Sequence, residues 1–444
     1  MPDKFKIINI DSLSYGGWGV GRADSKVVFV AYAVPGDNLK IEILEEHKNY
    51  DFAVINKIIK PSDVRIEPVC KYFGICGGCD YLDMSYNAEI YWKTEIFKKE
   101  FKKIFGSNYF EQDVPIKFNP AKANLNYRQK IGLKIHNKNI GFYKKYSHDV
   151  VNIEQCHLAK DGLNKLLKKA VGVLLSEKYY RTVTKNISLL TISEAGFKNI
   201  ILRVKNNFKL PTEFIKDIFT GTKCDNIFLE SADKKIIKYT TGDADKNNNK
   251  KFLTIKDKKF LYDLPSFIQI NKEQNENIIN AISDYIETIT KRGAKKFSNA
   301  LDLYCGFGNI SLFLTSYADR ITGVESGDFA IELGKKNAVL NNISNIKFVK
   351  SDVSKFLDKI EKDKKFDLII LDPPRSGIKG LTGKITDLNP LYIIYVSCDT
   401  MTFLRDLKQF DEKGYEIEKI DLFDMFPRTY HLEQVAFLRK NRQS

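Results

Sequence analysis

The sequence lacks an apolar run long enough to cross a membrane, and its first ten residues show no charged segment followed by an apolar one. We therefore expect a cytoplasmic protein without a membrane partner, in which thiols stay reduced. The seven cysteines are then expected to be ligands, nucleophiles or core residues rather than disulfides. Nothing in the sequence implies an obligate protein partner.

Acidic residues are few beside basic ones, since 56 Asp and Glu face 71 Lys and Arg and leave a net charge of +15. A chain this basic suggests a polyanionic partner, of which nucleic acid is the commonest. A lysine- and asparagine-rich habit of composition, as in KNNNKK at 246–251, would explain the charge equally well. The length of 444 residues is enough for two or three domains.

Residues 1–62 predict a small all-β domain. SYGGWGVGR at 14–22 is a glycine-rich turn, and strand-like runs follow on either side of a second turn at Pro35-Gly36-Asp37. Five short strands fit a barrel of the OB type, which often binds RNA, although a generic barrel without a ligand fits equally well. The pattern resembles the TRAM domain of RNA-modifying enzymes.

Residues 63–262 predict a central α+β domain with three clustered cysteines and a fourth that follows later in the chain. Cys70, Cys76 and Cys79 lie within ten residues, with Gly77-Gly78 between the last two, and Cys156 follows much later. Four thiolates suit either zinc or an iron–sulfur cluster. The Cys-x5-Cys spacing is loose for a zinc ribbon and no second Cys-x2-Cys pair exists, so the spacing leaves the metal open.

Other stretches of the central region carry weaker signals. Residues 86–105 predict an amphipathic surface helix with a basic outer face, and its packing on the third domain is left open. Arg, Lys and Tyr interleave in 126–134 and 140–151, which suits phosphate contact and base stacking. The hydrophilic stretch 241–251 predicts an exposed loop.

Residues 263–444 predict a doubly wound α/β domain, because strands alternate with helices as in a Rossmann-like parallel sheet. Asp302-x-x-x-Gly306-x-Gly308-Asn309 follows one strand and opens a helix, and Glu325 and Asp352 end the next two strands. A dinucleotide site would want glycine at position 311, which is serine. The pattern therefore favours S-adenosylmethionine over NAD, and a helix-start turn without a cofactor is the alternative.

Two further buried strands end in reactive residues. The run 366–371 ends at Asp372-Pro373-Pro374, and the run 391–396 ends at Ser397-Cys398-Asp399. Ligands of open α/β sheets bind beyond the carboxyl ends of the strands, so Asp372 and Cys398 are expected to face one crevice. A turn aspartate and a half-buried cysteine are the plainer reading of each residue alone.

The motifs together resemble one family, the RNA uracil-5-methyltransferases, which act on ribosomal or transfer RNA. The resemblance covers nearly the whole chain, with one slight departure at Ser376, where Ala or Lys is frequent. Beside the barrel and the cysteines, it rests on FIQIN (267–271), LDLYCGFGN (301–309), LDPPRSG (371–377), VSCDT (396–400) and HLEQVAFL (431–438).

The resemblance implies a role for each candidate residue. Cys398 would be the nucleophile that adds to C6 of uracil, and Glu433 the base that removes the C5 proton, while His431 is expected to be structural. A 4Fe–4S cluster would be held by Cys70, Cys76, Cys79 and Cys156. The S-adenosylmethionine pocket would be lined by Gln269, Tyr304, Asn309, Glu325, Asp352 and Asp372.

The expected substrate is a structured RNA, 23S rRNA before transfer RNA, with a dual-site enzyme left open. Two other classes compete. An amino-methyltransferase acting on DNA or protein also carries paired prolines after an acidic or amide residue, but it needs no cysteine nucleophile. A non-catalytic RNA-binding protein with a redox-sensing cluster would transfer no methyl group.

Overall fold

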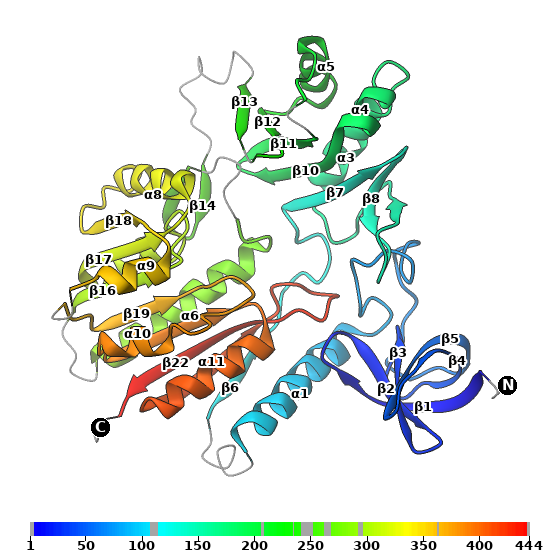
Figure 1. The fold of residues 1–444 in the computed structure, drawn as a ribbon, viewed down its shortest axis with the longest axis horizontal. Coiled ribbons are helices and arrows are strands. Elements are labelled where there is room, and N and C mark those ends of the chain that lie inside the picture. The colour runs from blue at the N-terminus through cyan, green and yellow to red at the C-terminus, as the bar shows by residue number, and fades with distance from the viewer. Residues whose placement is uncertain are drawn as a thin grey trace.

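The structure is a computed structural model that describes residues 4–106, 114–205, 208–233, 235–240, 252–261, 268–291, 296–361 and 364–441. The loop expected at 241–251, the domain boundary expected at 262–263 and Phe267 of the FIQIN motif lie outside these residues. Within them, no helix is both long and apolar enough to span a bilayer. Figure 1 shows a barrel at lower right, a sheet with its helices at upper right and a larger layered domain at left.

The N-terminal part is a closed five-stranded barrel in the order β1-β2-β3-β5-β4. Alternate residues point inward, so that Ile8, Val28, Val30 and Ala53 are buried in its own small core. The barrel fits the OB-like fold predicted for this segment. Its strands are β1 (Phe5–Ser14), β2 (Trp18–Ala23), β3 (Lys26–Ala31), β4 (Asn38–Glu46) and β5 (Tyr50–Lys60).

The central part is a seven-stranded sheet in the order β13-β12-β11-β10-β7-β8-β9, with helices on one face. α3 buries Leu163, Leu166, Leu167, Ala170 and Leu174, the helical spacing of an amphipathic face. Its helices are α3 (Asp161–Leu174), α4 (Tyr180–Asn186) and α5 (Thr212–Thr222). Its strands are β7 (Lys130–His136), β8 (Asn139–Tyr143), β9 (Val150–Asn152), β10 (Ile187–Ala195), β11 (Phe197–Val204), β12 (Asn226–Glu230) and β13 (Ile236–Thr240); a hairpin of β14 (Leu253–Ile255) and β15 (Lys258–Phe260) follows.

The C-terminal part is built on an eight-stranded sheet in the order β18-β17-β16-β19-β20-β22-β21-β6. β16 to β20 are parallel, as predicted, whereas β22 runs antiparallel to both β20 and β21. Its strands are β16 (Phe297–Leu303), β17 (Ala318–Glu325), β18 (Ile346–Lys350), β19 (Leu368–Leu371), β20 (Tyr392–Ser397), β21 (Tyr415–Phe423), β22 (Glu433–Lys440) and β6 (Ile116–Asn119). Its helices are α6 (Lys272–Lys291), α7 (Ser311–Leu314), α8 (Asp328–Leu340), α9 (Val353–Lys359), α10 (Thr382–Asp387) and α11 (Thr400–Glu412).

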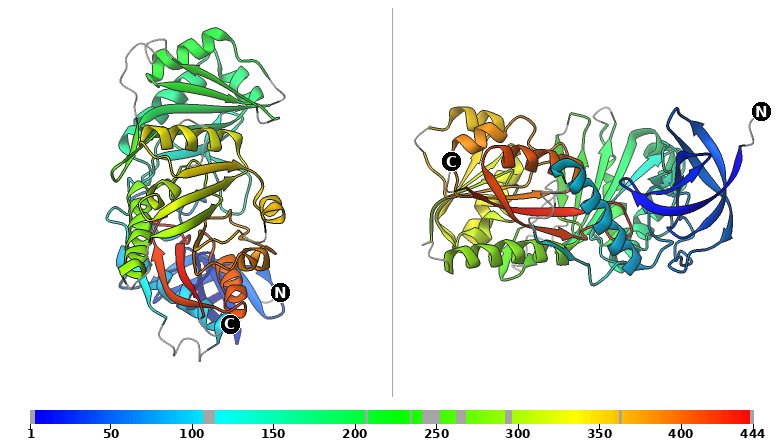
Figure 2. Two further views of the ribbon diagram at one scale, coloured as in Figure 1. Left: turned by 90° about the vertical axis from the view of Figure 1, so that its left-hand side faces the viewer. Right: turned by 90° about the horizontal axis from the view of Figure 1, so that it is seen from below.

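Two elements that precede the central sheet in the chain belong spatially to this C-terminal sheet. β6 pairs in parallel with β21 at the sheet edge. The helix α1 (Tyr86–Phe105) begins at Ser85, whose side chain accepts a hydrogen bond from the amide of Ala88. Its buried rings Phe97, Phe101 and Phe105 lie in the core beside α11, so α1 runs between the barrel and the sheet (Figure 2).

Candidate active site

The loop after β16 has a left-handed backbone at three positions. Tyr304, Gly306 and Gly308 have φ of 66°, 56° and 91°. A side chain at Gly308 would place its Cβ 3.1 Å from the ring of Phe348, so glycine is required there for packing as well as for its backbone. The pKa of Tyr304 is raised to about 12, first by burial and then by the charges of Asp352 and Asp406. The glycine loop and the end of β18 therefore face one space.

Asp302 lies in β16, just before this loop, and one oxygen of its carboxyl group has no hydrogen-bond partner among the described residues. Its Oδ2 accepts a hydrogen bond from the hydroxyl of Ser311, whereas its buried Oδ1 has no partner among the described residues. Burial raises its pKa to about 7, against the effect of the Ser311 hydrogen bond and with that of Asp372. The serine that separates this motif from a dinucleotide loop thus holds Asp302, which the sequence analysis named only as the start of the motif.

The predicted cofactor residues differ in how far other contacts already use them. Asn309 forms a reciprocal amide pair with Asn275 of α6, at 2.9 and 2.8 Å, which ties the glycine loop to that helix. Glu325 accepts at Oε1 from the amide of Gly327 (2.8 Å). Asp352 is exposed and caps α9 by accepting from the amide of Lys355 (3.1 Å). Asn309 and Asp352 therefore have structural work that the sequence did not predict.

Gln269 lies in a segment that is held against the start of the central sheet. Its carbonyl accepts from the side chain of Gln129 (3.0 Å), and the amide of Gln129 donates to the carbonyl of Ile270 (3.1 Å). The segment enters α6, where Asn275 holds the glycine loop. Gln269 thus lies in the segment just before α6, the helix that is hydrogen-bonded to the glycine loop through Asn275.

The residues around the glycine loop can be compared with the chemical groups of S-adenosylmethionine. Glycines leave room beside the loop, and carboxylates stand at or just beyond the carboxyl ends of β17, β18 and β19. The unpaired Oδ1 of Asp302 is a buried acceptor beneath them. Hydrogen-bond acceptors around a glycine-lined turn fit the ribose hydroxyls and amino group of S-adenosylmethionine.

Cys398 and Glu433 stand opposite each other at the end of an antiparallel strand pair. Ser397 of β20 is paired with Gln434 of β22, and the two candidates are the next residues beyond that pair on each strand. Cys398 is half-buried and Glu433 is 3% exposed. The register therefore brings a thiol and a carboxyl group to one place from positions that are distant in the sequence.

The electrostatics of this place oppose ionisation. Burial raises the pKa of Cys398 to about 12, with Glu433 adding to the effect and Arg375 opposing it. Burial also raises the pKa of Glu433 well above its usual range, with Asp372 adding and Arg375 opposing. The pKa of Asp372 is raised to about 7 by burial. Three acids converge here, and Arg375 of the proline turn favours the charged forms of Cys398 and Glu433.

The residue after the nucleophile candidate is held by the N-terminal barrel. Asp399 caps α11 by accepting from the amide of Thr402 (2.9 Å), and its Oδ2 accepts from the hydroxyl of Tyr15 at 2.9 Å. Burial and the carboxylate raise the pKa of Tyr15, so the phenol keeps its proton and donates. No sequence motif signals this contact between residues 384 positions apart.

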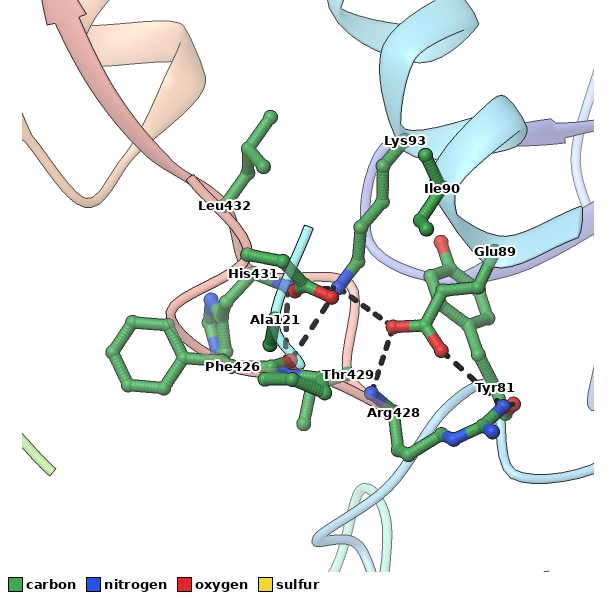
Figure 3. A network of polar contacts seen from close by, with 12 residues as sticks. Tyr81, Glu89, Ile90, Lys93, Ala121, Phe426, Arg428, Thr429, His431 and Leu432 are labelled. Carbon is green, nitrogen blue, oxygen red and sulfur yellow. Dashed lines mark hydrogen bonds and ion pairs between the residues drawn. The ribbon is translucent and has the colours of Figure 1, made fainter. Parts of the chain in front are cut away.

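A buried ionic network fixes the loop 424–432, which leads directly into Glu433 (Figure 3). The ammonium of Lys93 in α1 contacts Asp424 at 2.7 Å and Glu89 at 2.8 Å. Glu89 in turn accepts from the amide of Arg428 at 2.7 Å. Tyr86 adds a hydrogen bond to the second oxygen of Asp424 (2.7 Å). α1 therefore holds the start and the middle of the loop.

Arg428 completes the charge balance of this network. Its guanidinium lies 3.5 Å from Glu89 and donates to the carbonyl of Met84 at 2.8 Å. Its backbone φ is 69°, a conformation that a residue with a Cβ adopts rarely. Beside it, His431 stays neutral, because burial and then Arg375 lower its pKa to about 4. His431 is thus placed as a structural residue beside the base candidate.

All four clustered cysteines line one cavity of about 70 Å³. Burial raises the pKa of Cys70, of Cys76 (to about 11) and of Cys79, and Arg128, which also lines the cavity, opposes the effect at Cys76 and Cys79. Within the described parts of the chain, no three Cys, His, Asp or Glu side chains are arranged to hold one metal ion. The donor set, four thiols around a common space with a cation beside it, fits a group larger than a single ion.

The cysteine loop is joined directly to the loop before Glu433. The amide of Asp80, next to Cys79, donates to the carbonyl of Arg428 (2.9 Å), and the carboxylate of Asp80 accepts from the amide of Tyr430 (3.1 Å). Lys145 forms an ion pair with the other oxygen of Asp80 at 2.8 Å. The segment that carries Cys79 is therefore hydrogen-bonded directly to the backbone of the loop 424–432.

The sheet order, the glycine loop and the row of carboxylates define a Rossmann-like methyltransferase that uses S-adenosylmethionine. A solved structure with this fold over nearly the same length is the tRNA (uracil-54, C5)-methyltransferase of Pyrococcus abyssi in complex with S-adenosyl-L-homocysteine. The likeness has a TM-score of 0.73 and 24% identity and covers 98% of this chain and 100% of the other.

The sequence comparisons identify the family. A family model described as tRNA (Uracil-5-)-methyltransferase matches residues 93–441. An uncharacterized RNA methyltransferase of Caldanaerobacter subterraneus is 32% identical over 98% of this chain and 97% of the relative. The 23S rRNA (uracil(1939)-C(5))-methyltransferase RlmD of Histophilus somni is 29% identical over 98% and 95%. The chain belongs to the RNA uracil-5-methyltransferase family, which confirms the family predicted from its motifs.

Proposed function

We propose that the protein transfers the methyl group of S-adenosylmethionine to C5 of a uridine in 23S rRNA through a covalent intermediate on Cys398. The observation that carries the proposal is the register of β20 and β22, which sets Cys398 opposite Glu433. Uracil C5 is a poor nucleophile, and a thiolate that adds to C6 turns the ring into an enolate that can attack a methyl donor. A nucleophile and a base at one strand end are what this route requires.

The steps assign one task to each residue. The Cys398 thiolate forms a bond to C6 as the C5–C6 double bond opens. C5 then bonds to the methyl group, whose bond to the sulfonium sulfur of the donor breaks and leaves S-adenosylhomocysteine. Glu433 takes the proton from C5, and the C6–S bond breaks to restore the double bond and the thiolate. The raised pKa of Glu433 makes its carboxylate a stronger base than an exposed glutamate. Arg375 stabilises the thiolate and carboxylate forms that start the reaction.

S-adenosylmethionine supplies the methyl group when it is bound. In this proposal Glu325 would accept hydrogen bonds from the ribose hydroxyls, and Tyr304 and Asp352 would flank the adenosine. Asp372 follows β19, and its charge adds to the raised pKa of Glu433. In this proposal it would orient the uracil or the amino group of the cofactor. Asn309 acts through its amide pair with Asn275, which holds the glycine loop in place. Gln269 completes the proposed set from the segment before α6.

Ribosomal RNA is the preferred substrate because RlmD relatives at 26–29% identity align with nearly the whole chain. Transfer RNA is the second candidate, since the family model and the similar archaeal structure are both named for it. A base stacked in folded RNA has to leave its stack to reach Cys398, so the enzyme is expected to flip it. The basic charge predicts RNA affinity that falls steeply with salt.

The four cysteines are proposed to hold a 4Fe–4S cluster. The support is the shared cavity, the four-thiol donor set and the cation of Arg128 beside it. Substitution of Cys79 by Ser should then remove iron and acid-labile sulfide from anaerobically purified protein together with its brown colour. Zinc in place of iron after such a purification would contradict the cluster.

The test of the function uses 5-fluorouracil-containing 23S rRNA and transfer RNA with S-adenosylmethionine. Fluorine at C5 cannot leave as a proton, so the C6 thioether should persist on a denaturing gel. The adduct should be absent with Cys398→Ala and present with Cys305→Ala, a buried cysteine of the glycine loop that serves as the matched control. The RNA that forms the adduct identifies the substrate. No adduct with either RNA would overturn the proposal in favour of an amino-methyltransferase or a binding protein.

A further inference from the structure

A continuous row of aromatic rings runs over the outer face of the barrel. We call it the aromatic stripe: Trp18 of β2, Phe29 of β3, Tyr50 and Phe52 of β5, and Tyr146 from the turn between β8 and β9. Ring centroids are 5.1 Å apart for Tyr146 and Trp18, 4.8 Å for Trp18 and Phe52, and 5.6 Å for both Phe52 contacts with Phe29 and Tyr50. The alternate residues Val28, Val30 and Ala53 fill the barrel core, so the stripe is not needed for that core.

Tyr146 is held in the stripe at a cost. Its side chain is 69% exposed, and its φ of 59° is unfavourable for an aromatic residue. Its ring nevertheless stacks on Trp18 at an interplanar angle of 13°. An exposed ring in a strained backbone, laid flat on a second ring, gains little for folding and leaves one aromatic face open.

Three lysines around the stripe are ion-paired. Lys145 lies 5.8 Å from the ring of Trp18 and 5.6 Å from that of Tyr146, yet its ammonium contacts Asp80 at 2.8 Å. Lys26 contacts Asp51 at 2.5 Å and Lys144 contacts Asp149 at 3.2 Å. The stripe itself therefore offers flat apolar faces, and the ammonium groups of these three lysines are held by carboxylates.

The stripe leads toward the catalytic loop. Asp80, which holds Lys145, also accepts from the amide of Tyr430, three residues before Glu433. On the barrel side, Tyr15 precedes Trp18 by one turn, contacts the ring of Tyr430 at 5.6 Å and donates to Asp399. A strand of RNA lying on the stripe would thus approach the place where Cys398 and Glu433 meet.

We propose that the aromatic stripe binds unpaired bases of the RNA next to the target uridine by stacking. This inference rests on the proposed function for its substrate class. Unpaired bases fit because every base has a flat π face, whereas a duplex presents only its phosphates and groove edges to such a surface. The outer face of β2 and β3 is also the face that OB-type barrels use for oligonucleotides.

The experiment follows Trp18 by fluorescence in the otherwise complete protein. The chain has two tryptophans, so Trp92→Phe leaves Trp18 as the single indole reporter. Without S-adenosylmethionine, a ten-nucleotide oligouridylate should quench its emission, and the same strand annealed to oligoadenylate should quench it far less. Equal quenching by strand and duplex would overturn the stacking model.

Substitutions at Tyr146 sharpen the test. Tyr146→Asn suits the left-handed backbone but removes the ring, and should weaken oligouridylate binding roughly 5- to 100-fold. Tyr146→Phe should bind like the parent, as should Tyr91→Ala, which removes a 56% exposed ring from α1. Because the Tyr146 ring is uncharged, the loss should be the same at 50 and 200 mM salt. An unchanged affinity with Tyr146→Asn, or a loss that vanishes at 200 mM salt, would overturn the inference.

The outcome is separable from that of the proposed function. If Tyr146→Asn binds normally while Cys398 still forms the 5-fluorouracil adduct, the stripe is wrong and the methylation proposal stands. If no adduct forms but the ring-dependent quenching is seen, the stripe binds RNA in a protein with another chemistry.

Discussion

Two buried groups of charges meet at the loop 424–432, and they are built on opposite principles. In the network of α1, Lys93 and Arg428 balance Glu89 and Asp424. In the pocket at the strand ends, Arg375 opposes the raised pKa values of Glu433 and Cys398, whereas Asp372 adds to both. Buried charges that are paired with opposite charges hold a structure in place. Buried acids with little opposing charge have raised pKa values, which suits them to proton transfer. The loop joins the two, so the balanced group positions the unbalanced one.

The largest expected effect comes from removing the unbalanced carboxylate. Glu433→Gln should lower the release of methylated RNA by roughly 10²–10⁴-fold, because the C5 proton loses its acceptor. The reaction should then stop after methyl transfer, and a covalent adduct with ordinary uridine RNA should accumulate on denaturing gels. The melting temperature should stay the same or rise at pH 8, since a carboxyl group whose pKa is raised by folding destabilises the folded state above its unfolded pKa. Ordinary turnover by this variant would remove Glu433 from the mechanism.

Breaking the balanced group should act on stability instead. Lys93→Met leaves Glu89 and Asp424 buried without their ammonium partner and should cost about 3–5 kcal/mol. The midpoint of urea unfolding reports the loss. The matched control is Lys98→Met, which breaks a partly exposed pair with Glu95 on the same helix and should cost at most about 1 kcal/mol. Equal effects of the two substitutions would mean that the network adds nothing to the position of the loop.

The cation of the pocket can be tested through pH. Both Cys398 and Glu433 act in their deprotonated forms and both have raised pKa values, so the rate should rise with pH across the neutral range. Arg375→Gln removes the charge that lowers both pKa values and should move this rise to higher pH. The rate should fall by roughly tenfold or less at pH 7 and by less at pH 9. Arg375→Lys should restore much of the original profile, and a loss equal at both pH values would point to a role in binding alone.

The smallest effect is expected at the contact between barrel and pocket. Tyr15→Phe removes one hydrogen bond to Asp399 and should lower single-turnover methyl transfer about 2- to 10-fold. Phe keeps the ring contact with Tyr430, so the RNA affinity should not change. A change confined to affinity would place Tyr15 on the RNA surface rather than in the support of Cys398.

Local patterns predicted the fold class and the family. Alternation of strands and helices indicated the parallel sheet, and the proline turn and VSCDT motif placed Asp372 and Cys398 at strand ends, where the structure has them. The glycine motif likewise predicted the turn after β16. These features depend on neighbouring residues, which is why the sequence carries them.

Contacts across the chain could not be predicted in this way. The antiparallel register that sets Glu433 beside Cys398 depends on strand pairing, and the amide pair of Asn309 depends on the position of α6. Arg375 stood in a quoted motif but received no role, because its influence appears only when the acids around it are placed. No motif signals the contact of Lys93 with Asp424 or that of Tyr15 with Asp399, since these partners lie over 300 positions apart.

The placement of α1 sets an order of events during synthesis. Lys93 leaves the ribosome 331 residues before Asp424, the partner that neutralises it in the core. At roughly 5–20 residues per second, the apolar face of α1 with Phe97 and Phe101 waits about 15–65 s for the strands it covers. The nascent chain therefore carries a finished barrel followed by an uncovered aromatic helix for most of its translation. The ring of Phe97 thus meets its partner Phe403 of α11 only when more than nine-tenths of the chain has been made.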